Sequence, residues 1–132
     1  MAVQKNIIKN DNMKAIVHVW GDAGDSSTVA LTDLLNSHQT SSGTLRADIA
    51  YVYCNASDAT TSSIKVYRGE DNTGTIALEM HGVSEYPGGY ALPSIGLDNS
   101  SSVHIVWETS GMMVLDLRKN EAYVSPNYNI GV

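Results

Sequence analysis

The chain contains no phenylalanine, a single cysteine (Cys54), and no apolar run near the roughly 20 residues that cross a membrane. One cysteine excludes an internal disulfide and a zinc site built on several cysteines. Eight basic residues against 14 acidic ones give a formal net charge of -6. The chain therefore lacks the basic footprint of a nucleic-acid-binding protein or of a peripheral anchor on an anionic membrane. The first residues also lack the apolar core of a signal peptide, so we expect a protein that is used without export.

What the sequence has is short alternating segments separated by polar turns. Its 132 residues suit one domain. No amphipathic helix of useful length is visible, although the end of the segment Ser27–Leu35 allows a helical turn. This spacing predicts an all-β fold, a two-sheet antiparallel β-sandwich of Greek-key or jelly-roll type. We assign residues 1–12 to an N-terminal arm, 13–123 to the sandwich and 124–132 to a C-terminal tail. The alternating segments are Lys14–Trp20, Ser27–Leu35, Leu45–Cys54, Ser63–Arg68, Thr75–His81 and Val103–Arg118.

The segment Val103–Arg118 has the pattern of one β-hairpin. A loop at Thr109-Ser110-Gly111, with Gly111 in the left-handed conformation, would align the apolar residues of the two strands on one face. The pairs would be Trp107 with Met113, Ile105 with Leu115 and Val103 with Leu117, leaving His104 opposite Asp116 on the other face. The alternation predicts that the first set lines the core, since a one-residue slip would bury Asp116 or Arg118.

Few residues suggest chemistry. The four histidines have no metal-ligand spacing, and the serines gather in loops without a nucleophile elbow. A His104–Asp116 contact could orient a base in a small hydrolase, but a surface cross-strand pair explains it more simply. Three acidic loops raise a calcium question, yet none has a calcium-binding pattern, and solvated turns are the simpler interpretation. They contain Asp22 with Asp25, Glu70 with Asp71, and Asp98 with Asn99. We therefore predict no catalytic residues, no metal and no cofactor.

Several segments, in order, resemble small virion structural proteins of tailed phages, especially marine and cyanobacterial phages. The similarity is one of strand lengths and turns and extends from about Asn10 to Tyr123. Proteins of this type are β-sandwiches that decorate or cement capsids or join head to tail, and the resemblance implies no catalytic residues. The segments that carry it are Asn10–Gly21, Val29–Leu35, Ile64–Gly69, Thr75–Gly82 and Gly111–Lys119.

The resemblance implies a non-enzymatic virion component, with capsid decoration or cementing favoured over a head–tail connector or tail part. The implied partners are the major capsid protein or other virion proteins, with the chain present as a homo-oligomer or in many copies on a particle assembled in the host cytoplasm. Apolar spots on the terminal segments, and tyrosines in the long loop from Gly82, are the candidate contacts. A carbohydrate- or host-surface-binding module using Tyr86 and Tyr90 is the alternative. The candidate partner-binding residues are Ile7, Ile8, Tyr86, Tyr90, Tyr128 and Ile130.

Overall fold

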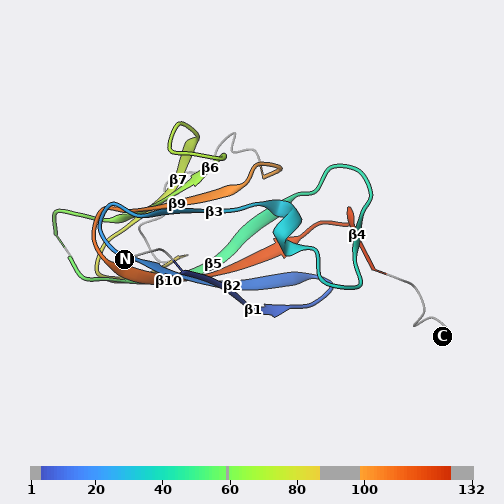
Figure 1. Ribbon diagram of the computed structural model, residues 1–132, viewed down its shortest axis with the longest axis horizontal. Coiled ribbons are helices and arrows are strands. Elements are labelled where there is room, and N and C mark those ends of the chain that lie inside the picture. Colours follow the sequence, from blue (N-terminus) through green and yellow to red (C-terminus); the bar gives the residue numbers. More distant parts are fainter. Residues whose placement is uncertain (1–3, 59, 87–98, 126–132) are drawn as a thin grey trace.

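Two antiparallel sheets pack face to face in the computed structural model, which describes residues 4–58, 60–86 and 99–125 (Figure 1). The predicted all-β sandwich is thereby confirmed. The five-stranded sheet has the order β1 (Gln4–Asn10), β2 (Lys14–Gly21), β10 (Gly111–Lys119), β5 (Ala47–Ala56) and β8 (Val83–Tyr86). The four-stranded sheet has the order β3 (Ser26–Val29), β9 (Val103–Trp107), β6 (Ile64–Arg68) and β7 (Thr75–Met80).

Two small elements lie at one end of the sandwich. The 3-10 turn η1 (Leu31–Leu34) follows β3, where the sequence allowed a helical turn. The short strands β4 (Thr40–Ser41) and β11 (Tyr123–Val124) pair with each other. The Tyr123 hydroxyl donates a 2.7 Å hydrogen bond to the Leu31 carbonyl oxygen, so this pair is fastened to η1.

The core lies between the two sheets and is built from alternate residues of each strand. The predicted inward set is confirmed, because Trp107, Met113 and their partners in the sequence pattern have no exposed surface. The Trp107 indole N–H donates to the Gly111 carbonyl oxygen at 3.1 Å, which satisfies its one polar atom. The largest fully buried side chains are Trp107, Leu34, Ile64, Met80, Ile105, Met113, Leu115, Leu117, Val17, Val19, Val29 and Val52.

The predicted hairpin is wrong. β9 pairs with β3 and β6, whereas β10 pairs with β2 and β5, so residues 108–110 form an arch from one sheet to the other. Alternation determines which side of each strand faces the core. It is the same whether two strands are hydrogen-bonded neighbours in one sheet or lie opposite each other in two sheets, so it cannot distinguish a hairpin from an arch. Gly111 is not among the glycines with positive φ. A Cβ at Gly111 would instead lie 2.8 Å from the Ala56 Cα, so the residue is needed for close approach of β10 to β5.

The segment assigned to an N-terminal arm is part of the five-stranded sheet over its described residues, because Gln4–Asn10 pairs with β2 as an edge strand. The register shifts between Ile7 and Lys9, which leaves Ile8 in a bulge. A bulge and two lysines, Lys5 and Lys9, are features that keep an exposed strand edge from pairing with another chain.

A second bulge determines which residues of β5 face outward. The register shifts between Asp116 and Leu117 of β10, so Ala50 has no direct partner. Ala47 is buried before the bulge, and Val52 and Cys54 are buried after it. Tyr51 and Tyr53 consequently lie on the solvent side of the sheet.

Candidate interaction surface

The outward side of the five-stranded sheet carries a group of apolar side chains near its centre. The register places them in rows across the strands, so residues that are distant in the sequence become neighbours. One row runs through Trp20, Met112, Asn55 and Val83, and the next through His18, Val114, Tyr53 and Glu85. We call this the outer face of the five-stranded sheet. Its apolar members are Ile16, Trp20, Tyr51, Tyr53, Val83, Met112 and Val114.

Several of these side chains are held by contacts with one another. The rings of His18 and Trp20 lie 4.6 Å apart between centroids at an angle of 44°. Burial and the nearby Glu85 carboxylate raise the pKa of Tyr51. Val83 is 69% exposed, and Tyr51 is 38% exposed. The face is therefore an ordered surface that presents apolar groups to solvent.

The outer face of the four-stranded sheet is different in character. Val106, Tyr67 and Ile76 are its half-buried apolar members, interspersed with charged and hydroxyl side chains. The Lys65 ammonium lies 2.8 Å from the Glu108 carboxylate. That hydrogen-bonded ion pair raises the pKa of Lys65 and lowers that of Glu108. Over the described residues, the larger apolar centre thus lies on the outer face of the five-stranded sheet, on β2, β10 and β5, with polar residues around it.

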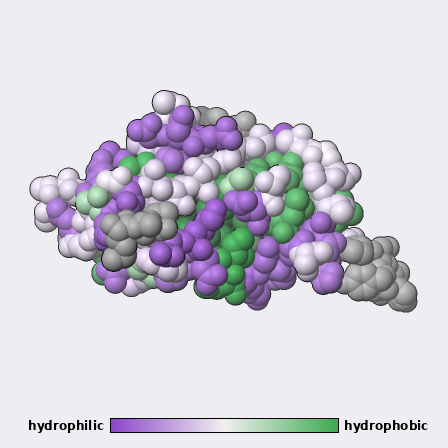
Figure 2. Space-filling model, viewed as in Figure 1, coloured by the Kyte–Doolittle hydropathy of each residue, from purple (hydrophilic) through white to green (hydrophobic). Residues whose placement is uncertain are grey.

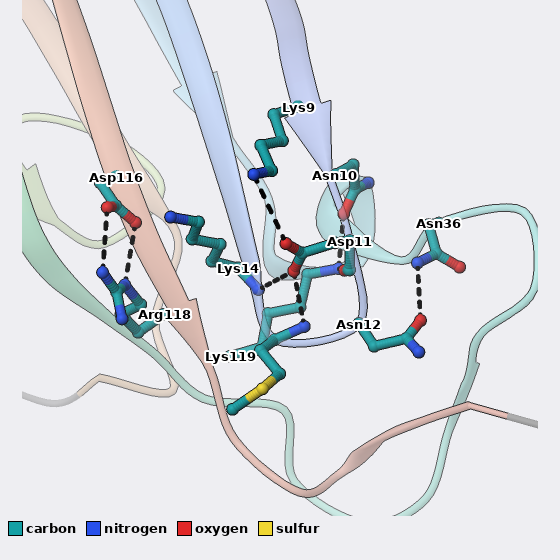
Figure 3. Close-up of polar contacts among 10 residues, drawn as sticks. Lys9, Asn10, Asp11, Asn12, Lys14, Asn36, Asp116, Arg118 and Lys119 are labelled. Atoms are coloured by element: carbon teal, nitrogen blue, oxygen red, sulfur yellow. Dashed lines mark hydrogen bonds and ion pairs between the residues drawn. The ribbon is translucent and has the colours of Figure 1, made fainter.

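Charged groups line the lower margin of the apolar face, at the end where β1 turns into β2 (Figure 3). The Asp11 carboxylate accepts the N–H groups of Met13 and Lys14, both at 2.8 Å, and these bonds lower its pKa. The Arg118 guanidinium lies 3.1 Å from the Asp116 carboxylate on β10. The Asp11 bonds fix the β1–β2 turn, while the Arg118–Asp116 pair joins the two outward charges of β10.

Behind this margin, Lys119 joins three segments. Its ammonium donates to Asn10 Oδ1 at 2.5 Å, to the Asp11 carbonyl at 2.8 Å and to Gln39 Oε1 at 2.7 Å. It also lies 5.4 Å from the centroid of the Tyr123 ring. Burial lowers the pKa of Lys119 to about 8, against the opposing charge of Asp11. These contacts connect the β1–β2 turn to the loop before β4, so Lys119 has a structural role.

Of the six residues predicted to bind a partner, the described ones fall into different environments. Ile7 and Tyr86 are half-buried and pack against the core, and Tyr86 pairs with inward-facing Val52. Ile8 is 55% exposed in the β1 bulge. The predicted residues Tyr90, Tyr128 and Ile130 lie outside the described residues. The apolar face was missed because its members come from β2, β5, β8 and β10, whose order cannot be derived from sequence spacing.

The predicted His104–Asp116 pair does not form, since the two residues lie in different sheets. His104 Nδ1 instead lies 2.7 Å from the Thr28 hydroxyl, and the His104 ring faces that of Tyr67 at 6.4 Å. Burial lowers the pKa of His104, although the Asp71 charge opposes this shift. The His104–Thr28 contact is a structural one, and the hydrolase interpretation loses its candidate dyad.

In the acidic loops considered for calcium, the carboxylates accept hydrogen bonds from backbone N–H groups of the same loop. Asp25 accepts the Asp22 N–H at 2.8 Å, and Asp71 accepts the Thr73 N–H at 2.9 Å. Within residues 4–58, 60–86 and 99–125, no three His, Cys, Asp or Glu side chains gather as a metal site would require. These contacts are typical of turns. Asp98 of the third loop lies outside the described residues.

Hydrophobic residues also reach the surface at the side of the sandwich, over η1 and the strands below it, while hydrophilic residues cover the β6–β7 end (Figure 2). No helix in the described part of the chain is long and apolar enough to span a membrane. Comparisons with protein-family models, with curated proteins and with solved structures found no match to this chain.

Proposed function

We propose that the protein is a non-enzymatic structural component of a tailed-phage virion, most simply a capsid decoration or cement protein that acts through protein–protein contacts. The observation that carries the proposal is the contrast between the two outer faces. The outer face of the five-stranded sheet has an apolar centre on its three inner strands, whereas the other outer face intersperses its apolar residues with charged ones, including the Lys65–Glu108 ion pair. A protein that docks by one side needs such an asymmetry, because contiguous exposed apolar surface is characteristic of interaction sites.

The closed hydrophobic core supports the same role. The core fills the space between the sheets, and the β9–β10 arch links the two sheets covalently. A cement protein binds across joints between shell subunits. If it is already folded before binding, no part of its binding free energy is lost to ordering the chain. The resemblance of the sequence segments to small virion proteins gives the direction of the proposal.

Quantitative mass spectrometry of purified particles of the encoding phage tests this function. We expect the chain in many copies, at a fixed ratio to the major capsid protein. A low fixed copy number would instead place it at the head–tail junction or in the tail. Particles that contain none of the chain, or only a trace, would refute a virion role.

A carbohydrate-binding module is the second candidate, and the rings of Trp20 and Tyr53 on the apolar face favour it. Aromatic side chains on an exposed sheet can stack on sugars, and the flanking Asn55 amide supplies hydrogen bonds. Of the two tyrosines predicted for this role, Tyr86 packs against the core instead, and Tyr90 lies outside the described residues. A glycan array with the wild type and Trp20→Ala distinguishes the two functions, and an array without signal eliminates this one.

A further inference from the structure

The apolar centre of the outer face of the five-stranded sheet lies on its inner strands, with Trp20 on β2, Val114 on β10 and Tyr53 on β5. Polar groups occupy its lateral and lower margins, including Lys9 on β1 and Glu85 on β8. An apolar centre with a polar rim is the usual organisation of a protein–protein interface.

The charges of this face distinguish it from the rest of the molecule. The chain as a whole carries -6, so two copies repel each other in most orientations. On this face and its margin the charges nearly balance, because three basic side chains meet four acidic ones. They are Lys9, Lys14 and Arg118 against Asp11, Asp48, Glu85 and Asp116, with Lys9 lying 4.0 Å from Asp11 in the same copy. Two copies that meet through this face therefore experience the least repulsion from the groups at the contact.

The area of the face is also large enough for a weak dimer interface. Five strands at about 4.8 Å and roughly seven residues at about 3.3 Å give a face of about 550 Å². Two such faces bury roughly 1,100 Å² in total, which is close to the lower end of specific interfaces. The interface would therefore be a reversible one.

We propose that two copies of this chain associate through the outer faces of their five-stranded sheets, around a two-fold axis parallel to the strands. This axis places β1 of one copy over β8 of the other. Lys9 then faces Glu85 of the second copy, and the reciprocal pair forms on the opposite side. The valines at position 114 lie near the axis, in the middle strand of each sheet. The dimer does not depend on the virion role and would stand if that role failed.

Sedimentation velocity of the full chain from about 1 µM to about 1 mM tests the proposal. We expect a concentration-dependent shift from the 14.2 kDa monomer to twice that mass. Val114→Glu would weaken association about a hundredfold or more, because it buries uncompensated carboxylates at the interface. Val106→Glu is the matched control, since Val106 is a half-buried valine on an inner strand of the other sheet's outer face. It should dimerise as the wild type does.

A charge swap keeps the test independent of how well Val114→Glu folds. Lys9→Glu should weaken the dimer, and Lys9→Glu combined with Glu85→Lys should restore it. A wild type that stays monomeric throughout the concentration range would overturn the proposal. So would a dimer that survives Val114→Glu in folded form or is lost in Val106→Glu. A monomer found in many copies on virions would refute the dimer while supporting the virion role.

Discussion

Cys54 provides a quantitative test of the β5 bulge. Uninterrupted alternation from Leu45 to Tyr53 would put Cys54 on the opposite side of the strand from Ala47, whereas the bulge buries both. Burial raises the pKa of the Cys54 thiol from 9.0 to about 11, against the opposing effect of the neighbouring Ser84 hydroxyl. The unfolded chain thus releases the thiol proton near pH 9, while the folded chain retains it to higher pH. This contribution to stability is fully present below pH 9 and is lost as the pH rises toward 11 and beyond.

The size of the loss follows from these two pKa values. Proton linkage gives about 1.4 kcal/mol of lost unfolding free energy by pH 10 and about 2.3 kcal/mol by pH 11. Urea unfolding of the wild type and of Cys54→Ala at pH 8, 9, 10 and 11 isolates this contribution, since both proteins share the titration of lysines and tyrosines. The difference between their unfolding free energies should shrink by these amounts. A difference that stays constant from pH 8 to 11 would refute a buried thiol at this position and, with it, the bulge.

Three further outcomes test the architecture. Gly111→Ala should lower the free energy of unfolding by about 1–3 kcal/mol in chemical denaturation, because its Cβ would collide with the Asn55 carbonyl oxygen; an unchanged midpoint would argue against the close approach of β10 to β5. Leu115→Ala should cost about 2–5 kcal/mol and Val114→Ala distinctly less, since these neighbours face the core and the solvent side respectively; equal costs would contradict the assignment of faces. An NMR titration should give His104 a pKa below 6.5, as burial requires, and a value above it would show a solvated or ion-paired ring.

Residue alternation predicted much of the core. Val103, Ile105, Trp107 and Leu115 all lie on the inward side that the pattern indicated, because strand periodicity is a local property. The partner of each strand is not local. β9 and β10 satisfy the same alternation whether they pair or face each other across the core, so the arch was read as a hairpin.

The candidate surface was predictable only in its parts. Alternation indicates that His18, Trp20 and Val114 share the outward side of their own strands. Their gathering into one patch depends on β10 lying between β2 and β5, and on the bulge at Ala50 that turns Tyr51 outward. Both features arise from long-range pairing, to which the spacing of residues along the chain gives no access.

The position of β10 has a consequence for synthesis. This strand occupies the middle of its sheet, between β2 and β5, yet the ribosome makes it after both. Until Gly111–Lys119 leaves the exit tunnel, β2 and β5 each have an unpaired backbone edge. The nascent chain therefore cannot complete its larger sheet until late in synthesis. A translation pause before that point would prolong an intermediate with open strand edges, which is prone to aggregation and is a substrate for chaperones.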